Sequence, residues 1–239
     1  MKRILIFFAF IVAANNICAQ APSGTFSVIP SIGVTLAKIS NDQNTSSVNA
    51  SNELLLSNSK SKAGMTVGAD VQYQFNEFFA LSAGVHYQQM GASYDDTDLS
   101  KATPGEYTVT RNQRLHLQYL GVPILAHCYV ANGLAINFGL QASWLLDNRL
   151  KYEQTKVTIG KDGSYTYQPT TDKTSLKSTA FNNIDLAIPF GISYEYQNVI
   201  LDARYMLGVS KLYKSSVDLD GNNRALVLSV EYKFDINKL

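Results

Sequence analysis

Apolar residues occupy every second position over several long stretches of this chain, and this alternation constrains the fold most strongly. Three such stretches follow one another between residues 181 and 234. Their apolar positions are Ile184, Leu186, Ile188, Phe190, Ile192, Tyr194 and Tyr196, then Val199, Leu201, Ala203, Tyr205, Leu207 and Val209, and finally Leu226, Leu228, Val230, Tyr232 and Phe234. Because strand side chains alternate between the two faces of a sheet, each stretch predicts a strand with one apolar and one polar face.

The apolar faces of these strands fit contact with lipid. In a membrane barrel, apolar side chains point outward to lipid and polar side chains fill the interior. A soluble eight-stranded barrel with its apolar side inward, such as a lipocalin, is the alternative. Strands of more than ten residues, unbroken apolar faces and alternating short and long connections favour the membrane barrel.

The rest of the chain raises the number of predicted strands to eight. Further alternating stretches lie at residues 26–36, 65–75, 79–87, 115–129 and 134–146. Short turns alternate with long polar connections; the turns lie around Asn76, Asn132 and Asn198, and the connections over residues 40–62, 91–111, 151–177 and 211–222. The sequence therefore predicts an all-β fold, a closed eight-stranded antiparallel transmembrane β-barrel with up-and-down meander order. Closure removes sheet edges, whose backbone groups hydrocarbon cannot satisfy.

Three local signals add detail to this fold. Residues 132–133 (Asn-Gly) are a strong hairpin signal, and residues 160–163 (Gly-Lys-Asp-Gly) predict a small hairpin inside the longest loop. Pro123 has no N–H to donate to a ladder, so a bulge or bend is expected at this residue.

The first twenty residues have the layout of a secretory signal peptide. A positive start, residues 1–3, precedes an unbroken apolar run over residues 4–14 and a polar, small stretch. This run is too short to span a bilayer as a helix, which needs about 20 residues. We expect residues 1–20 to be removed and residues 21–239 to form one barrel domain; a lipoprotein anchored through Cys18 is the alternative. Cys128 is then the single remaining cysteine, which excludes an intramolecular disulfide.

Export and a barrel fold together predict a protein of the bacterial outer membrane. The termini and short turns then lie on the periplasmic side, and the long loops are extracellular. The expected partners are outer-membrane lipids and lipopolysaccharide, the barrel-assembly machinery during insertion, and an envelope or secretion complex. The net charge is +1 and the chain has no basic block, so nucleic acid is not an expected partner.

Several segments resemble those of PorT-like outer-membrane β-barrel proteins of the porin family. These segments are residues 78–91 (FFALSAGVHYQQMG), 119–125 (YLGVPIL), 185–208 and 224–234. They cover nearly the whole mature chain and occur in the family's order. The resemblance implies an outer-membrane barrel and no single shared activity. The chain departs from the family at Gly121, where a Glu is usual, so an interior charge common in the family is missing.

Charged side chains on the polar strand faces form the candidate site. We expect a polar network in the barrel interior that consists of Asp70, Arg114, Asp185, Glu195, Asp202, Arg204, Glu231 and Lys233. One interpretation is a polar pathway or ligand site. A salt-bridged plug is favoured, because side chains fill an eight-stranded barrel and buried charges must be paired.

The three histidines give little support for a metal site or for catalysis. His86 and His116 are predicted to point inward, as is Arg114. His127 is predicted to point outward, near the end of the barrel that carries the short turns. In the predicted strand over residues 115–129, the outward, apolar face then begins with Leu115, Leu117 and Tyr119. No spacing typical of metal ligands accompanies the histidines, and Ser93 near His86 is a weak basis for a lipid-modifying enzyme. We therefore predict no catalytic residue, no metal and no cofactor.

Three functions fit these observations. The first, which is favoured, is a non-enzymatic outer-membrane barrel that acts through its extracellular loops or as part of an envelope or secretion complex. The second is a narrow channel for small solutes or hydrophobic ligands. The third is a lipid-modifying barrel enzyme.

The last strand ends in an aromatic-x-aromatic pattern, Tyr232 and Phe234. This ending resembles the C-terminal signal that the outer-membrane assembly machinery reads. The alternative is that both rings are simply lipid-facing strand residues.

Truncation tests the closure of the barrel. A chain that ends after Asn223 lacks the last strand and leaves two open sheet edges in hydrocarbon, so it should fail to insert into membranes. A chain that ends after Asp235 should behave as the full chain, because the missing tail lies beyond the barrel. Heat-modifiable mobility on cold SDS gels measures both outcomes, and a folded band from the shorter chain would contradict closure.

Overall fold

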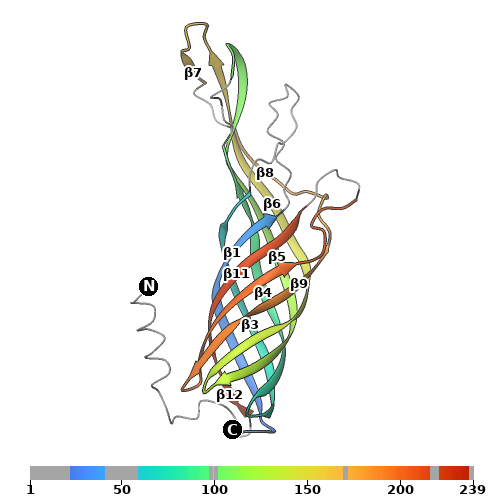
Figure 1. Ribbon diagram of the computed structural model, residues 1–239. Helices are drawn as coiled ribbons and strands as arrows, with labels where there is room; N and C mark the ends of the chain where they lie inside the picture. The colour runs from blue at the N-terminus through green and yellow to red at the C-terminus, as the bar shows by residue number, and fades with distance from the viewer. Residues whose placement is uncertain are drawn as a thin grey trace, which may run out of the picture.

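Eight long strands form a ring in the computed structural model, which describes residues 22–40, 59–96, 99, 102–168, 172–215 and 221–236 (Figure 1). In chain order they are β1 (Phe26–Ser40), β3 (Lys62–Asn76), β4 (Phe79–Tyr94), β5 (Gly105–Ala131), β6 (Leu134–Ile159), β9 (Ile184–Tyr196), β10 (Val199–Gly208) and β11 (Asn222–Tyr232). Each strand is antiparallel to the next, and β11 pairs back onto β1 from Ser31↔Glu231 to Ser40↔Asn222. The predicted closed, eight-stranded meander is confirmed. Within the described ranges, no helix is long and apolar enough to cross a membrane.

Four short strands extend this ring. β2 (Ser59–Lys60) pairs with β4, and β12 (Phe234–Asp235) pairs with β1. β7 (Tyr165–Tyr167) and β8 (Asp172–Leu176) both pair with β6. The pairing of Ile159 with Tyr165 confirms the small hairpin predicted at residues 160–163.

Tight turns join the strands at one end of the barrel, here called the turn end; the opposite end is the loop end. At the β9–β10 turn both Gln197 and Asn198 have positive φ, 47° and 69°, as a type I′ hairpin requires. Gly133, with φ of 74°, serves the β5–β6 turn. These turns match the right-handed twist of the strands they join.

β5 and β6 are much longer than the alternation predicts, at 27 and 26 residues. Their ladder runs from Ala131↔Leu134 at the turn end to Gly105↔Ile159, so parts of both predicted loops are strand. These parts are rich in Thr, Val and Tyr, which favour strands, but they lack the lipid-facing alternation. Figure 1 shows them rising beyond the barrel together with β7. We call residues 105–111 and 153–159, with β7 and β8, the arm.

Apolar side chains cover the outside of the barrel in a band. On β1 the outward positions from Phe26 to Leu36 are all apolar, and Ile32 is 62% exposed. Ten steps of about 3.3 Å, tilted by about 40°, give the band a height of about 25 Å, as expected for a membrane barrel. Leu140 on β6 and Leu201 on β10 are also exposed outward, at 67% and 56%. The predicted arrangement, with apolar side chains facing lipid, is confirmed for these strands.

Aromatic rings line the turn-end edge of this band. Their centroids are 4.6, 4.7 and 5.6 Å apart in a row that consists of Phe26, Tyr73, Phe75 and Phe79. Aromatic girdles of this kind mark the interface between membrane and water.

The two faces of the strands exchange character above the band, toward the loop end. On β4 the inward side chains change from Ser82, His86 and Gln88 to Met90, Ala92 and Tyr94. Buried apolar side chains gather at this height in one cluster, here called the apolar layer, whose larger members are Ile39, Met90, Tyr94, Leu115, Leu117, Tyr119, Phe181, Met206, Leu212, Tyr213 and Val227. Outside the hydrocarbon the outer face meets water and headgroups, so the apolar side chains of these strands move inside.

This exchange overturns the predicted orientation of the upper part of β5. Leu115, Leu117 and Tyr119 are at most 2% exposed and face the interior. Arg114 and His116, predicted to point inward, lie on the outer face. The prediction was wrong because it extended the lipid-facing rule into a region above the hydrocarbon.

Pro123 interrupts the β4–β5 ladder without shifting it. The pairs on either side, Ala83↔Ile124 and His86↔Gly121, share one register, and the rungs between them are missing. The predicted bulge is therefore absent, because the loss of the proline N–H removes hydrogen bonds without adding a residue.

Lysine substitutions test where the band ends. Leu140→Lys places a charge in the band and should lower the free energy of unfolding by about 2–4 kcal/mol. Gln118→Lys, on the outer face of β5 above the band, should cost only about 0–1 kcal/mol. Urea titrations in lipid vesicles measure the free energy of unfolding of both variants. Equal losses would contradict the proposed upper edge of the apolar band.

Candidate functional site

Polar side chains fill the interior on the turn-end side of the apolar layer. Seven of the predicted network residues are buried in the barrel, at 2–8% exposure: Asp70, Asp185, Glu195, Asp202, Arg204, Glu231 and Lys233. The eighth, Arg114, is exposed on the outer face of β5, so its predicted interior place is wrong. Arg114 lies in the upper part of β5, where the polar face of the strand is the outer face.

Arg204 is the centre of the largest charged cluster. Its Nη2 lies 3.2 Å from Asp202 Oδ1 and 3.9 Å from Glu231 Oε1, which links β10 to β11. Ser229 Oγ donates to Glu231 Oε1 at 3.0 Å. A buried cation with two carboxylates satisfies the rule that charges inside a protein must be paired.

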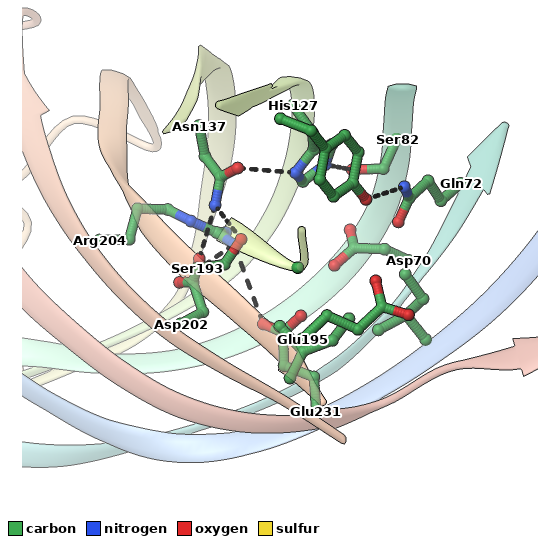
Figure 2. Close-up of a pocket in the computed structure, with 14 residues that line it drawn as sticks. Asp70, Gln72, Ser82, His127, Asn137, Ser193, Glu195, Asp202, Arg204 and Glu231 are labelled. Carbon is green, nitrogen blue, oxygen red and sulfur yellow. Dashed lines mark hydrogen bonds and ion pairs between the residues drawn. The ribbon is translucent and has the colours of Figure 1, made fainter. Parts of the chain in front are cut away.

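A chain of hydrogen bonds joins this cluster to the opposite strands (Figure 2). Ser82 Oγ lies 2.8 Å from His127 Nε2, and His127 Nδ1 lies 2.9 Å from Asn137 Oδ1. The amide oxygen can only accept, so Nδ1 carries the proton and Nε2 accepts from the serine hydroxyl. Asn137 Nδ2 then donates to Asp202 Oδ2 at 3.0 Å. The chain ties together β4, β5, β6 and β10.

A second ion pair closes the interior at the turn end. Lys233 Nζ donates to Glu195 Oε2 at 2.7 Å and lies 6.0 Å from the centre of the Tyr129 ring. The Tyr129 hydroxyl accepts from Gln72 Nε2 at 3.0 Å. Lys233 is only 2% exposed, so its charge is sealed from solvent by these neighbours.

The remaining two predicted carboxylates have partners of their own. Asp70 Oδ2 lies 2.9 Å from Nε2 of His86, which points inward as predicted. Asp185 lies higher, at the apolar layer, where its Oδ1 accepts from Ser210 Oγ at 3.2 Å. The structure therefore groups the predicted residues into separate pairs and clusters at different heights.

Sequence reasoning missed the neutral half of this network, above all His127. This histidine was predicted to face outward and points inward instead, because the odd-numbered residues of β5 face the interior along the whole barrel. A signal was present: the even positions Leu120, Ile124 and Val130 are apolar, and they are exposed to lipid at 37%, 52% and 58%.

Gly121 leaves room for a polar neighbour. A Cβ atom at this residue would lie 2.5 Å from Gln141 Nε2 and 3.0 Å from Ser143 Oγ. Gln141 Nε2 donates to Gln88 Oε1 and to Ser143 Oγ, both at 2.9 Å. Neutral side chains thus occupy the space beside the position where PorT-like proteins carry a glutamate.

The geometry of Ser82, His127 and Asn137 resembles a hydrolase triad, but it is closed to substrate. Ser82 is 3% exposed, and the cavity beside it has a volume of about 10 Å³, room for about one water molecule. An acyl group cannot reach the hydroxyl through such a space. Among the described residues, no group of three His, Cys, Asp or Glu side chains is arranged to hold a metal ion. The arrangement is that of a packed, paired plug.

The ion pair at the turn end offers a test of this plug. Lys233→Met leaves Glu195 buried without its cation and should lower the free energy of unfolding by about 3–5 kcal/mol. The double variant Lys233→Met/Glu195→Leu removes both charges and should recover most of that loss. Urea titrations in lipid vesicles decide the matter, and a single variant as stable as the double one would contradict the buried pair.

A family model and several solved structures are similar to this chain. Residues 18–214 match the family model of the outer membrane protein beta-barrel domain. Similar solved structures include Ail, the attachment invasion locus protein of Yersinia pestis (16% identity, TM-score 0.39, covering 89% of this chain and 99% of that chain), and Neisserial surface protein A (16% identity, TM-score 0.41, 90% and 100%). OprG from Pseudomonas aeruginosa is similar at 11% identity and a TM-score of 0.37, with 91% and 99% covered. No curated protein matches the chain significantly. Its apolar band therefore crosses the bacterial outer membrane, and the chain belongs to the family of outer membrane protein beta-barrel domains.

Proposed function

We propose that this barrel is a non-enzymatic anchor that displays the arm outside the cell as a binding element. In this proposal the turn end and both termini are periplasmic, and the loop end is extracellular. The arm carries the proposal, because β5 and β6 stay paired up to Gly105↔Ile159, well beyond the apolar band. A ladder of this length holds its surface in one conformation, which suits recognition better than a flexible loop does.

The arm has structure of its own. Val109, Val157 and Ile159 are at most 5% exposed, so the arm buries a small apolar contact. Tyr165 and Tyr167 are about half exposed, and the Arg111 guanidinium lies 5.3 Å from the centre of the Tyr167 ring. Exposed Tyr and Arg side chains on a rigid support are the residue types most enriched at protein interfaces.

One edge of the arm supports a specific mode of binding. Within the described residues, the β4–β5 ladder ends at Ser93↔Arg114, while β5 stays paired with β6 up to Gly105↔Ile159. Asn112 N donates to Asp96 Oδ1 at 3.0 Å, which covers the base of this edge. A strand edge that continues beyond the ladder of its neighbour can accept an extended segment of another protein as an added strand. The partner class we propose is therefore a protein that presents an extended peptide.

The filled interior supports this proposal over a channel or a lipid-modifying enzyme. The apolar layer lies across the barrel toward the loop end and the paired charges toward the turn end, so the lumen offers little room for solute or substrate. The proposal also includes membership of an envelope or secretion complex, because such a complex would bind the outer surface of the barrel. The resemblance to PorT-like proteins supports membership of that subgroup, which has no single activity.

Site-specific photo-crosslinking in living cells tests where the protein acts. A photoreactive residue in place of Tyr107 or Lys156, both in the arm, should give discrete adducts with a second protein. The same residue in place of Glu77, in the β3–β4 turn, is the matched control at the turn end and should give none.

The alternative outcomes separate the hypotheses. Adducts from Glu77 alone would contradict the arm proposal and favour a periplasmic envelope complex. Absence of adducts from all positions, in cells where the barrel is folded, would contradict a protein partner altogether.

A further inference from the structure

Positive charges collect on the outer face of the barrel just above the apolar band. Arg114 and His116 on β5 pair across the ladder with Lys151 and Arg149 on β6. Lys62 lies across β4 from them, where its Nζ donates to the Met90 carbonyl oxygen at 3.4 Å. We call these five residues the basic patch.

The height of the basic patch follows from the register. The lipid-facing pair Leu120↔Trp144 lies below Gln118↔Asp147, and His116↔Arg149 is the next outward rung. Four residue steps of about 3.3 Å, tilted by about 40°, place His116 about 10 Å above Leu120 along the membrane normal. This is the depth of lipid headgroups, because the hydrocarbon ends near the last apolar rung.

The charges of the basic patch are close enough to act on one another. Partial burial, followed by the positive charges of Lys62, Lys151 and Arg114, lowers the pKa of His116 to about 4. His116 is therefore neutral at pH 7, and the charge of the patch comes from its lysines and arginines. Burial and the charges of Arg114 and Lys151 also lower the pKa of Lys62.

Carboxylates beside the basic patch compensate it only in part. Asp147 lies 3.0 Å from Arg149 and 2.9 Å from Lys177, and hydrogen bonds from Lys177 and then Arg149 keep its pKa below the usual range. Glu153 accepts from Asn112 and pairs with Lys173 at 3.6 Å. Among the described residues, no carboxylate lies within ion-pair distance of Lys62, Arg114 or Lys151.

Two further cations lie at a similar height on another part of the ring. Lys38 on β1 and Arg224 on β11 are directly paired, one outward rung above the apolar pair Leu36↔Leu226. The positive charge thus follows the edge of the band over several strands rather than one loop.

We propose that the basic patch binds the phosphate groups of the glycolipid that forms the outer leaflet, lipopolysaccharide. Arginine binds phosphate oxygens with two parallel hydrogen bonds, and each basic residue near an anionic lipid surface adds favourable energy. Position and charge both select this ligand, because the patch is at headgroup depth and has cations in excess. The proposal rests on the extracellular orientation of the loop end given under Proposed function, but it does not depend on a partner of the arm, since no residue of the patch belongs to the arm.

Trp144, the single tryptophan of the chain, gives a local probe for the experiment. It faces outward at 45% exposure, two rungs below Arg149. The mature barrel is refolded into phosphatidylcholine vesicles that contain a small fraction of lipid A with a quencher on its acyl chain. Quenching of Trp144 then reports how strongly lipid A is enriched beside the patch, with phosphorylated lipid A compared with its dephosphorylated form.

Two charge-matched variants make the test specific. The patch variant Arg114→Gln/Arg149→Gln/Lys151→Gln should lower the enrichment of phosphorylated lipid A about tenfold or more. The arm variant Lys156→Gln/Lys161→Gln/Lys173→Gln loses the same charge and should retain the wild-type enrichment. Heat-modifiable mobility verifies that each variant is folded, and inorganic phosphate should not displace the lipid.

Four results would overturn the proposal. They are equal enrichment in the wild type and the patch variant, an equal loss in the arm variant, equal quenching by dephosphorylated lipid A, and displacement by inorganic phosphate at low concentration. The second would indicate general charge attraction, and the last a soluble phosphate ligand. A failure of the arm to crosslink to a protein partner would not change the outcome of any of these lipid measurements.

Discussion

The hydrogen bonds between β11 and β1 are the constraint on which the rest of the structure depends. In hydrocarbon an unpaired backbone group costs several kcal/mol, so a spanning sheet has to close on itself. The ten consecutive pairs from Ser31↔Glu231 to Ser40↔Asn222 close this sheet, and the ring of eight strands follows. Eight strands leave an interior just wide enough for side chains. The buried network and the apolar layer are thus consequences of closure at this strand number.

The interior divides by height because the exterior does. Where lipid covers the outside, the apolar side chains face it, and the inward positions are left to paired polar groups such as Arg204 with Asp202. Where headgroups and water cover the outside, the same strands turn Leu115 and Leu117 inward and Arg114 outward. One barrel therefore combines the inside-out pattern of a membrane protein with a small core of the kind found in soluble proteins.

The sequence predicts the part of the fold that lipid dictates and fails where lipid ends. The outward positions of β9, of β10 and of β11 from Leu226 onward are all apolar, and the order of these strands, their outward faces and the β9–β10 turn agree with the structure. On β5 the apolar residues occupy odd positions near Leu115 and even positions near Ile124. A rule that assigns all apolar residues to the lipid-facing side therefore fails on one of the two segments. This single change of phase misplaced Arg114, His116 and His127. Contacts such as His127 with Asn137 join residues on different strands, and alternation carries no information about such partners.

The arm imposes an order on the assembly of the barrel. Residues 105–111 and 153–159 carry charged and hydroxyl side chains on a ladder with no lipid-facing surface, and hydrocarbon is a costly place for them. A chain that enters from the turn side must therefore move this polar hairpin across while a gap between strands is still open. The closing contact of β11 with β1 removes that gap. Passage of the arm therefore has to precede the pairing of β11 with β1.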